Sequence, residues 1–331
     1  MDLNSVRELK RNAIETVMTM IEPAIVAAAA RPQTGEPRRF ISLGIAPVPG
    51  KGGYRLAIRL QREDADSALA AERLRELARD EVDVRFTGRI RKATSAYPFA
   101  SRIGQNRLLR IGDSIGHYRV TAGTLGAFSR VRCDDNGPVH LLSNNHVIAN
   151  ENRSRMKDAV LQPGPSDGGK VNHDRVAGMA RFIPLVGSPN TVDCAIAEID
   201  PGVDYDPRNI PNLGLFSGGV ASSVEDGIRL KKFGAASGLT NGRVTAFEVN
   251  DIVVGYSIGN LRFNEQIEVE GANGGPFAKR GDSGSLVVDG DRLAVGLVFA
   301  TSNVGGTNGK GLTYVNPIRP VLDALNVDLI S

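Results

Sequence analysis

Three residues of this 331-residue chain have the types and spacing that nucleophilic catalysis requires. Ser283 lies in the sequence GDSGS at 281–285, directly before the apolar run 286–288. A serine nucleophile needs a sharp turn that exposes its hydroxyl and aims backbone N–H groups at one point, and flanking glycines allow such a backbone. The same residues could form an ordinary tight turn between strands, so the motif alone leaves both interpretations open.

A serine nucleophile also needs a base and a group that orients this base. His146, one of four histidines, follows a strand-like apolar run, and Asp193 leads the apolar run 193–199. The separations are 47 residues from His146 to Asp193 and 90 from Asp193 to Ser283. We therefore predict that Ser283 attacks a carbonyl carbon, His146 carries the proton, Asp193 orients the histidine, and the N–H groups of Gly281 and Ser283 hold the oxyanion.

Short strands must position these residues. The chain has 38 glycines and 17 prolines, which favours many tight turns. Short apolar runs with glycine-rich breaks recur from 120 to 315, and a helix is predicted at 317–326. This pattern predicts a barrel or sandwich. Hydrophobic residues make up 41% of the chain, which excludes a disordered protein, and two cysteines exclude a disulfide-stapled scaffold.

The first third of the chain has a different pattern. Apolar residues at helical spacing predict a helix at 3–29, and the order strand, strand, helix, strand is predicted at 40–48, 54–61, 67–80 and 82–90. We divide the chain into an N-terminal helix at 1–30, a small α+β domain at 31–92, a linker or junction at 93–114 and a strand-rich domain at 115–331.

The order His, Asp, Ser with a GDSG turn resembles the trypsin/chymotrypsin-like serine protease family, whose fold is two six-stranded antiparallel β-barrels with the triad between them. The tracts AGTLG at 122–126, DCAIA at 193–197 and VGLVF at 295–299 are similar to family strands. The resemblance covers about 115–325. It implies a mainly β fold, a double antiparallel β-barrel preceded by the small α+β domain, a protein or peptide substrate, and no cofactor or metal.

A narrower resemblance rests on further tracts. The segments 114–117, 141–150, 162–169 and 190–193 are similar to a group of bacterial, intracellular trypsin-like proteins with a small N-terminal α/β domain. The tract 234–244 is distantly similar to plant NARROW LEAF-type proteases. The resemblance to the bacterial group supplies no physiological substrate. The function expected from the family is a serine endopeptidase, for which the N-terminal domain is a candidate regulator.

The chain departs from the extracellular members of the family in two ways. Val147 stands where they carry a paired cysteine, and Cys133 and Cys194 are not the usual partners, so we expect two free buried thiols and a cytoplasmic location. The sequence has no activation site of the R-I-V-G-G type. Asp282, which supports the oxyanion turn, must therefore find another cationic or N–H partner, because a buried unpaired carboxylate is costly.

The resemblance also places a specificity pocket. The residue six positions before the serine floors this pocket in the family, and an acid there selects basic side chains; here it is Phe277. We therefore predict a preference for small or medium apolar side chains. The expected pocket residues are Phe277, Phe299, Ala300, Thr301 and Gly311.

Two alternatives to a constitutive protease stay open. The absence of an activation site and the basic N-terminal third are also consistent with a latent or self-processing scaffold that acts mainly by binding proteins. Residues 1–110 carry 20 Lys and Arg against 13 Asp and Glu, a balance of +7. The N-terminal domain is a candidate for homo-oligomerisation or a regulatory partner, whereas no aromatic-rich motif for nucleic acid appears.

No membrane contact is expected from the sequence. No apolar run approaches the ~20 residues of a membrane span. Glu15, Glu22 and Pro23 interrupt the apolar stretch that a signal peptide would need.

Overall fold

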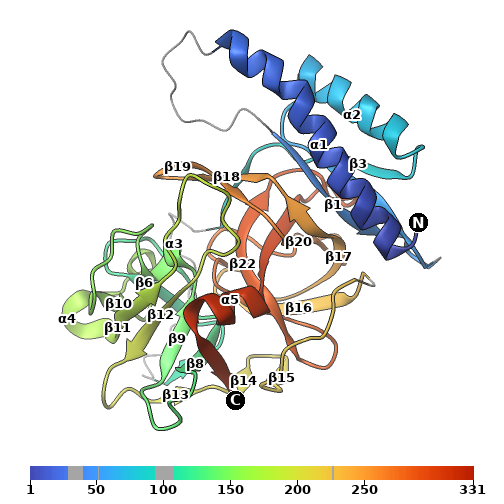
Figure 1. The fold of residues 1–331 in the computed structure, drawn as a ribbon. Helices are drawn as coiled ribbons and strands as arrows, with labels where there is room; N and C mark the ends of the chain where they lie inside the picture. The colour runs from blue at the N-terminus through green and yellow to red at the C-terminus, as the bar shows by residue number, and fades with distance from the viewer. Residues whose placement is uncertain (29–39, 51, 94–107, 226) are drawn as a thin grey trace.

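The computed structural model describes residues 1–28, 40–50, 52–93, 108–225 and 227–331. Residues 31–39, the start of the predicted α+β domain, and most of the predicted junction at 93–114 lie outside the described residues. Within these ranges the protein is mainly β, with a curled sheet of eight strands, a barrel of six strands and an N-terminal unit packed on the barrel (Figure 1).

The C-terminal half of the chain forms a closed barrel. Its six strands, in spatial order, are β16 (Arg229–Gly234), β17 (Gly238–Asn250), β20 (Gln266–Gly271), β23 (Leu312–Pro317), β22 (Ala294–Ser302) and β21 (Leu286–Val288). Each pairs antiparallel with the next, and β21 pairs with β16, so the ring has no free edge. Alternating apolar residues such as Val244, Val269 and Val315 fill the interior.

The preceding unit is a curled sheet. Its strands, in spatial order, are β8 (Ala127–Val131), β9 (His140–Ser143), β12 (Ala195–Ile199), β11 (Arg175–Phe182), β10 (Ala159–Leu161), β6 (Ser114–His117) and β7 (Gly123–Thr124). Its apolar face is fully buried around Phe128, Leu141 and Ile196. Helix α5 (Ile318–Leu325) and strand β24 (Val327–Ile330) bring the chain back, and β24 pairs with β8. The predicted fold class is confirmed.

The N-terminal unit has the predicted order of elements. They are α1 (Leu3–Ala28), β1 (Ile41–Pro47), β2 (Tyr54–Leu60), α2 (Ala65–Leu77) and β3 (Val82–Phe86). Strands β1 and β2 form an antiparallel hairpin, and α2 is the crossover to β3, which lies parallel to β2. Helices α1 and α2 lie side by side over this sheet (Figure 1).

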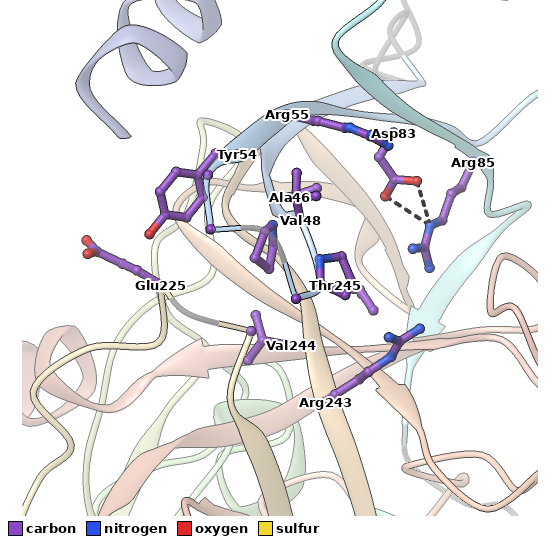
Figure 2. Close-up of a pocket in the computed structure, with 16 residues that line it drawn as sticks. Ala46, Val48, Tyr54, Arg55, Asp83, Arg85, Glu225, Arg243, Val244 and Thr245 are labelled. Atoms are coloured by element: carbon purple, nitrogen blue, oxygen red, sulfur yellow. Dashed lines mark hydrogen bonds and ion pairs between the residues drawn. The ribbon is translucent and has the colours of Figure 1, made fainter. Parts of the chain in front are cut away.

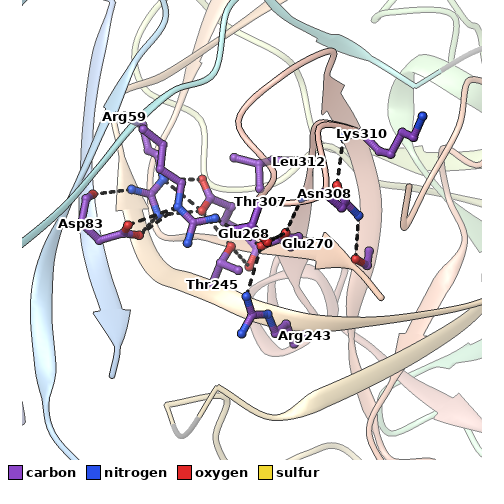
Figure 3. A network of polar contacts seen from close by, with 12 residues as sticks. Arg59, Asp83, Arg243, Thr245, Glu268, Glu270, Thr307, Asn308, Lys310 and Leu312 are labelled. Carbon is purple, nitrogen blue, oxygen red and sulfur yellow. Dashed lines mark hydrogen bonds and ion pairs between the residues drawn. The ribbon is translucent and has the colours of Figure 1, made fainter. Parts of the chain in front are cut away.

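This N-terminal unit is joined to the barrel as one continuous sheet. Strand β1 pairs antiparallel with β17. Beneath it, the fully buried Arg59 donates from Nε to Glu268 Oε2 at 2.8 Å and from Nη2 to Asp83 at 2.8 Å (Figure 3). Burial works against the charge of Arg59, but the two carboxylates outweigh it and raise its pKa. Removing either partner would leave a buried charge, so the contact holds the two parts together.

Helix α1 is fastened to the barrel by a second set of charges. Arg7 contacts Glu248 at 2.6 Å and Glu225 at 2.8 Å, and the buried Lys10 contacts Glu248 at 3.2 Å. Burial alone would raise the pKa of Glu248, but its bonds to Arg7 and Lys10 lower it. Glu248 therefore stays ionised and holds the helix.

The predicted strand at 82–90 is two separate strands. Strand β3 ends at Phe86, and Gly88 has φ +62°, a conformation that breaks an extended run. The chain then forms β4 (Ile90–Lys92), which leaves the β2–β3 sheet and pairs with two strands of the barrel sheet: antiparallel with β22, and parallel with β18 (Ile252–Tyr256). The alternation of apolar residues continues across Gly88, which is why the sequence indicates one strand.

Short elements complete the described chain. They are β5 (Leu109–Arg110), α3 (Asn145–Ile148), η1 (Pro165–Asp167), α4 (Val171–Asp174), β13 (Tyr205–Asp206), β14 (Asn209–Ile210), β15 (Gly214–Leu215) and β19 (Gly259–Phe263). Both cysteines are free; Cys194 is buried as expected, whereas Cys133 is exposed in a turn at φ +63°. None of the helices in the described ranges is both long and apolar enough to span a membrane.

Candidate active site

The structure brings Ser283, His146 and Asp193 together between the two strand units. His146 lies on α3 after β9, Asp193 directly precedes β12, and Ser283 lies in the turn before β21. His146 Nε2 is 2.8 Å from Ser283 Oγ, and His146 Nδ1 is hydrogen-bonded to Asp193 Oδ2. All three side chains are fully buried. The order carboxylate, imidazole, hydroxyl is the arrangement that lets a histidine take a proton from serine.

Asp193 is held from several sides. Its Oδ1 accepts the backbone N–H of His146 at 3.2 Å, and its Oδ2 accepts the Tyr256 hydroxyl at 2.7 Å. Its own backbone N–H donates to Asn316 Oδ1 at 2.9 Å, and its carbonyl accepts from Asn144 Nδ2 at 2.7 Å. These hydrogen bonds compensate the burial of the Asp193 side chain.

Tyr256, on β18, was not predicted from the sequence. Its ring lies edge-on to His146 with centroids 5.6 Å apart, and it stacks on Phe263. Burial first, and then the negative charge of Asp193, raise the pKa of the Tyr256 hydroxyl. The hydroxyl therefore keeps its proton and donates it to Asp193, which fixes the carboxylate toward the histidine.

Two backbone N–H groups converge beside the serine, as the oxyanion prediction requires. Gly281 N–H and Ser283 N–H both point at one oxygen, the carbonyl of Ala93; the Ser283 distance is 3.4 Å. Gly281 has φ +104°, which side chains rarely adopt, so glycine is required to aim this N–H. The acceptor belongs to the residue that directly follows β4.

The predicted need of Asp282 for a partner is met by Lys232, on the inward face of β16. Lys232 Nζ is 3.1 Å from Asp282 Oδ2, and both side chains are fully buried. Asp282 also accepts from Ser237 Oγ at 2.6 Å, from the N–H groups of Ala236 and Ser237 at 3.1 Å each, and from Lys279 N–H at 2.8 Å. Burial lowers the pKa of the Lys232 ammonium, and the Asp282 carboxylate opposes that shift.

The first strand unit also holds the oxyanion turn. Thr124, on β7, donates its N–H to the Ser283 carbonyl at 2.7 Å and its hydroxyl to the Gly281 carbonyl at 2.9 Å. Ala235 N–H donates to the Thr124 hydroxyl at 3.1 Å. Both strand units therefore fix the conformation of the turn that carries the serine.

Four of the five expected pocket residues lie beside Ala93 or opposite β4. Phe277 is buried and shares an apolar cluster with Ala93, and the Phe299 carbonyl accepts the Ala93 N–H at 3.0 Å. Ala300 and Thr301 lie on β22 opposite β4. Gly311, at φ +80°, packs against the Ser302 carbonyl. Lys232 Nζ lies 5.7 Å from the centre of the Phe277 ring, so this ring contacts the neighbourhood of both the buried ion pair and Ala93.

Other candidate groups lie apart from this site. The hollow in Figure 2 lies under the β1–β2 turn, between Asp83 and Arg85 of β3 and the residues of β17, and none of the three catalytic candidates lines it. His117 is paired with Asp158 at 3.2 Å. Among the residues that the structure describes, no three His, Cys, Asp or Glu side chains form a group that could hold a metal ion.

Comparisons with known proteins concern the fold. No family model and no curated protein matches this chain. Protease A of Thermobifida fusca is 16% identical, with a TM-score of 0.47, over 68% of this chain and 99% of that one. The chymotrypsin of Cellulomonas bogoriensis is 18% identical, with a TM-score of 0.46, over 67% of this chain and 98% of that one. The HtrA-type protease AlgW is 18% identical, with a TM-score of 0.36, over 66% of this chain and 60% of that one.

Proposed function

We propose that this protein is a serine endopeptidase that hydrolyses peptide bonds through Ser283, His146 and Asp193. The observation that carries the proposal is the unbroken chain of hydrogen bonds from Tyr256 through Asp193 and His146 to Ser283. Two N–H groups converge on one point beside the serine. A turn between strands needs neither feature, whereas acyl transfer needs both.

The chemistry follows from these positions. Ser283 Oγ attacks the carbonyl carbon of a peptide bond, and His146 Nε2 takes the hydroxyl proton. The carbonyl oxygen becomes an oxyanion between Gly281 N–H and Ser283 N–H. His146 then gives the proton to the leaving amine, and the C–N bond breaks. Water, activated by His146, hydrolyses the acyl-serine to a carboxylic acid and restores the hydroxyl.

The Lys232–Asp282 pair supports a site that forms without prior cleavage of the chain. The ammonium of Lys232 supplies a buried positive charge next to Asp282 from within β16. With that charge and four hydrogen bonds in place, Asp282 can hold the turn at 281–284 in its oxyanion-binding conformation. The protein therefore needs no new amino terminus to organise this turn.

The test is covalent labelling with a fluorophosphonate, followed for hours because the Ala93 carbonyl competes for the oxyanion position. We expect the wild type to label and Ser283→Ala and His146→Ala to lose labelling. Ser283→Ala should lower the rate of peptide hydrolysis by about 10⁴–10⁶. Ser222→Ala, the same change at an exposed serine, is the matched control and should label normally. Equal labelling of Ser283→Ala and the wild type would refute the mechanism.

A further inference from the structure

The cleft beside Ser283 is filled by the protein's own chain. Strand β4 (Ile90–Lys92) lies antiparallel along β22, with Lys92 opposite Ala300 and Arg91 opposite Thr301. Its other edge pairs with β18. Ala93, the residue after β4, is fully buried. A second peptide cannot bind to this part of β22 while residues 90–93 remain there.

Ala93 is held by the groups that would hold a reacting residue. Its N–H donates to the Phe299 carbonyl at 3.0 Å, and its carbonyl oxygen accepts from both Gly281 N–H and Ser283 N–H. The hydroxyl of Ser283 bonds to the base His146 at 2.8 Å. A strand that merely packs would need the pairing with β22 and nothing more. The added pair of hydrogen bonds brings the Ala93 carbonyl to the backbone of Ser283, the residue that carries the nucleophile.

The side chains of the segment also match their surroundings. The methyl group of Ala93 lies in an apolar cluster with Phe277 and Val298. Lys92 Nζ is 2.5 Å from Glu151 Oε1, and Glu151 is buried and further held by Ser257 and Ile258. Burial alone would raise the pKa of Glu151, but its bonds to Lys92 and Ser257 lower it. The Glu151 carboxylate is therefore ionised and forms an ion pair with the Lys92 ammonium.

Ile90 completes the match. It is buried in an apolar cluster that includes Leu261, Phe299 and Leu312, whereas Arg91 points to solvent. From Ile90 to Ala93 the side chains are buried, exposed, partly buried and buried, so the two ends of the segment are enclosed and its middle reaches the surface. The surroundings of these four positions thus fit an aliphatic side chain at 90, any side chain at 91, a basic one at 92 and a small one at 93.

We propose that residues 90–93 are the enzyme's own substrate and that the protein cleaves its chain after Ala93. This inference rests on the proposed function. Ser283 Oγ forms a bond to the Ala93 carbonyl carbon, the peptide C–N bond that follows Ala93 breaks, and His146 passes the serine proton to the departing amine. One water then releases Ala93 as a carboxylic acid. The products are residues 1–93 and 94–331.

The two products stay together after cleavage. The sheet pairing of β1 with β17, the buried pair Arg59–Glu268 and the contacts of Arg7 with Glu248 all join residues 1–93 to the barrel. Cleavage therefore appears as two bands on a denaturing gel and as one particle in solution.

The experiment is intact-mass measurement of the full-length protein over time. We expect masses for 1–93 and 94–331 from the wild type and a single intact mass from Ser283→Ala. The first-order rate should be unchanged by a 50-fold dilution, because attack occurs within one chain. A rate that rises with protein concentration, or a cut at another bond, would overturn the proposal.

Two variants test the recognition of the segment. Ala93→Leu enlarges the residue in the apolar cluster and should slow cleavage at least tenfold; Ala68→Leu, the same change on the exposed face of α2, should not. If Ala93→Leu also lowers the melting temperature, Lys92→Ala replaces it, since it removes the contact with Glu151 and leaves the apolar cluster intact. Wild-type rates for both Ala93→Leu and Lys92→Ala would overturn the assignment of the segment.

A separate readout distinguishes failure of this inference from failure of the proposed function. The probe is the peptide acetyl-Ile-Arg-Lys-Ala joined to a fluorogenic amine. Hydrolysis of the probe by a protein that stays intact at Ala93 would overturn self-cleavage and leave the endopeptidase standing; residues 90–93 would then be an inhibitor. Neither self-cleavage, nor probe hydrolysis, nor fluorophosphonate labelling would overturn both proposals.

Discussion

Replacing Lys232 by methionine removes the buried cation next to Asp282 while keeping an unbranched side chain of similar length. The two charged atoms are 3.1 Å apart. At an effective dielectric constant of 20, that separation corresponds to an attraction of about 5 kcal/mol. Asp282 keeps four hydrogen-bond donors, from Ala236 N, Ser237 N, Ser237 Oγ and Lys279 N. We therefore expect a net loss of about 3 kcal/mol, at the lower end for breaking a buried pair.

This loss acts on the oxyanion turn, because Asp282 lies between Gly281 and Ser283. The variant can relieve the unpaired charge by rearranging the turn so that Asp282 faces water. A destabilisation of the formed turn by about 3 kcal/mol lowers its population by about 100-fold. The second-order rate constant for fluorophosphonate labelling should fall by the same factor. The free energy of unfolding in urea should fall by no more than about 3 kcal/mol, because the turn can relax without unfolding the barrel.

Lys231→Met is the matched control, since Lys231 is the adjacent residue of β16 and its side chain is exposed. The double variant Lys232→Met/Asp282→Asn removes both charges and should recover most of the lost stability, because no unpaired charge remains. Labelling of Lys232→Met at the rate of Lys231→Met and the wild type would refute the reasoning. The turn would then be held by the hydrogen bonds of Asp282 alone.

Two further outcomes follow from the buried polar groups. Tyr256→Phe removes the hydroxyl that donates to Asp193 at 2.7 Å, so Asp193 holds His146 less firmly and fluorophosphonate labelling should slow about tenfold; an unchanged labelling rate would argue against this role. Burial raises the pKa of Asp113 to about 6, against the opposing Arg110 N–H, so its stabilising contribution is fully present below pH ~4 and is lost as the pH rises through 6. Asp113→Asn should therefore add about 3 kcal/mol to the free energy of unfolding in urea at pH 7.5 and nothing at pH 3.5, and equal effects at both pH values would contradict it.

The sequence predicts the parts of the site that depend on residue type and order. Ser283, His146 and Asp193 were found because a nucleophile, a base and an acid each require particular side chains, and the GDSG turn marks the backbone that aims N–H groups. The fold class followed from short apolar runs with glycine-rich breaks. These signals are local, because each can be recognised without knowing which distant parts of the chain are in contact.

Two residues of the site had weaker signals in the sequence. Leu230 and Lys232 share one face of their strand, and this face is buried. A lysine on an otherwise apolar strand face is the one signal in the sequence that indicates a buried acidic partner. Tyr256 lies at the end of an apolar strand, where a tyrosine is commonly a core residue. Which carboxylate each one meets depends on the pairing of strands far apart in the chain, and a single sequence does not specify that pairing.

The position of Ala93 had no side-chain signal, because a main-chain carbonyl carries out its role. What brings it to the serine is the attachment of the N-terminal unit. Strand β3 ends at Phe86, three residues separate it from β4, and Arg59–Glu268 fixes the sheet from which the chain departs (Figure 3). So short a connection from a fixed anchor gives residues 90–93 an effective concentration at the cleft in the millimolar range or above. A peptide from outside must compete with that concentration, so intact protein should hydrolyse external substrates slowly. Under the proposed mechanism, intramolecular attack at Ala93 has no such competitor, and self-cleavage should therefore precede the hydrolysis of any external peptide.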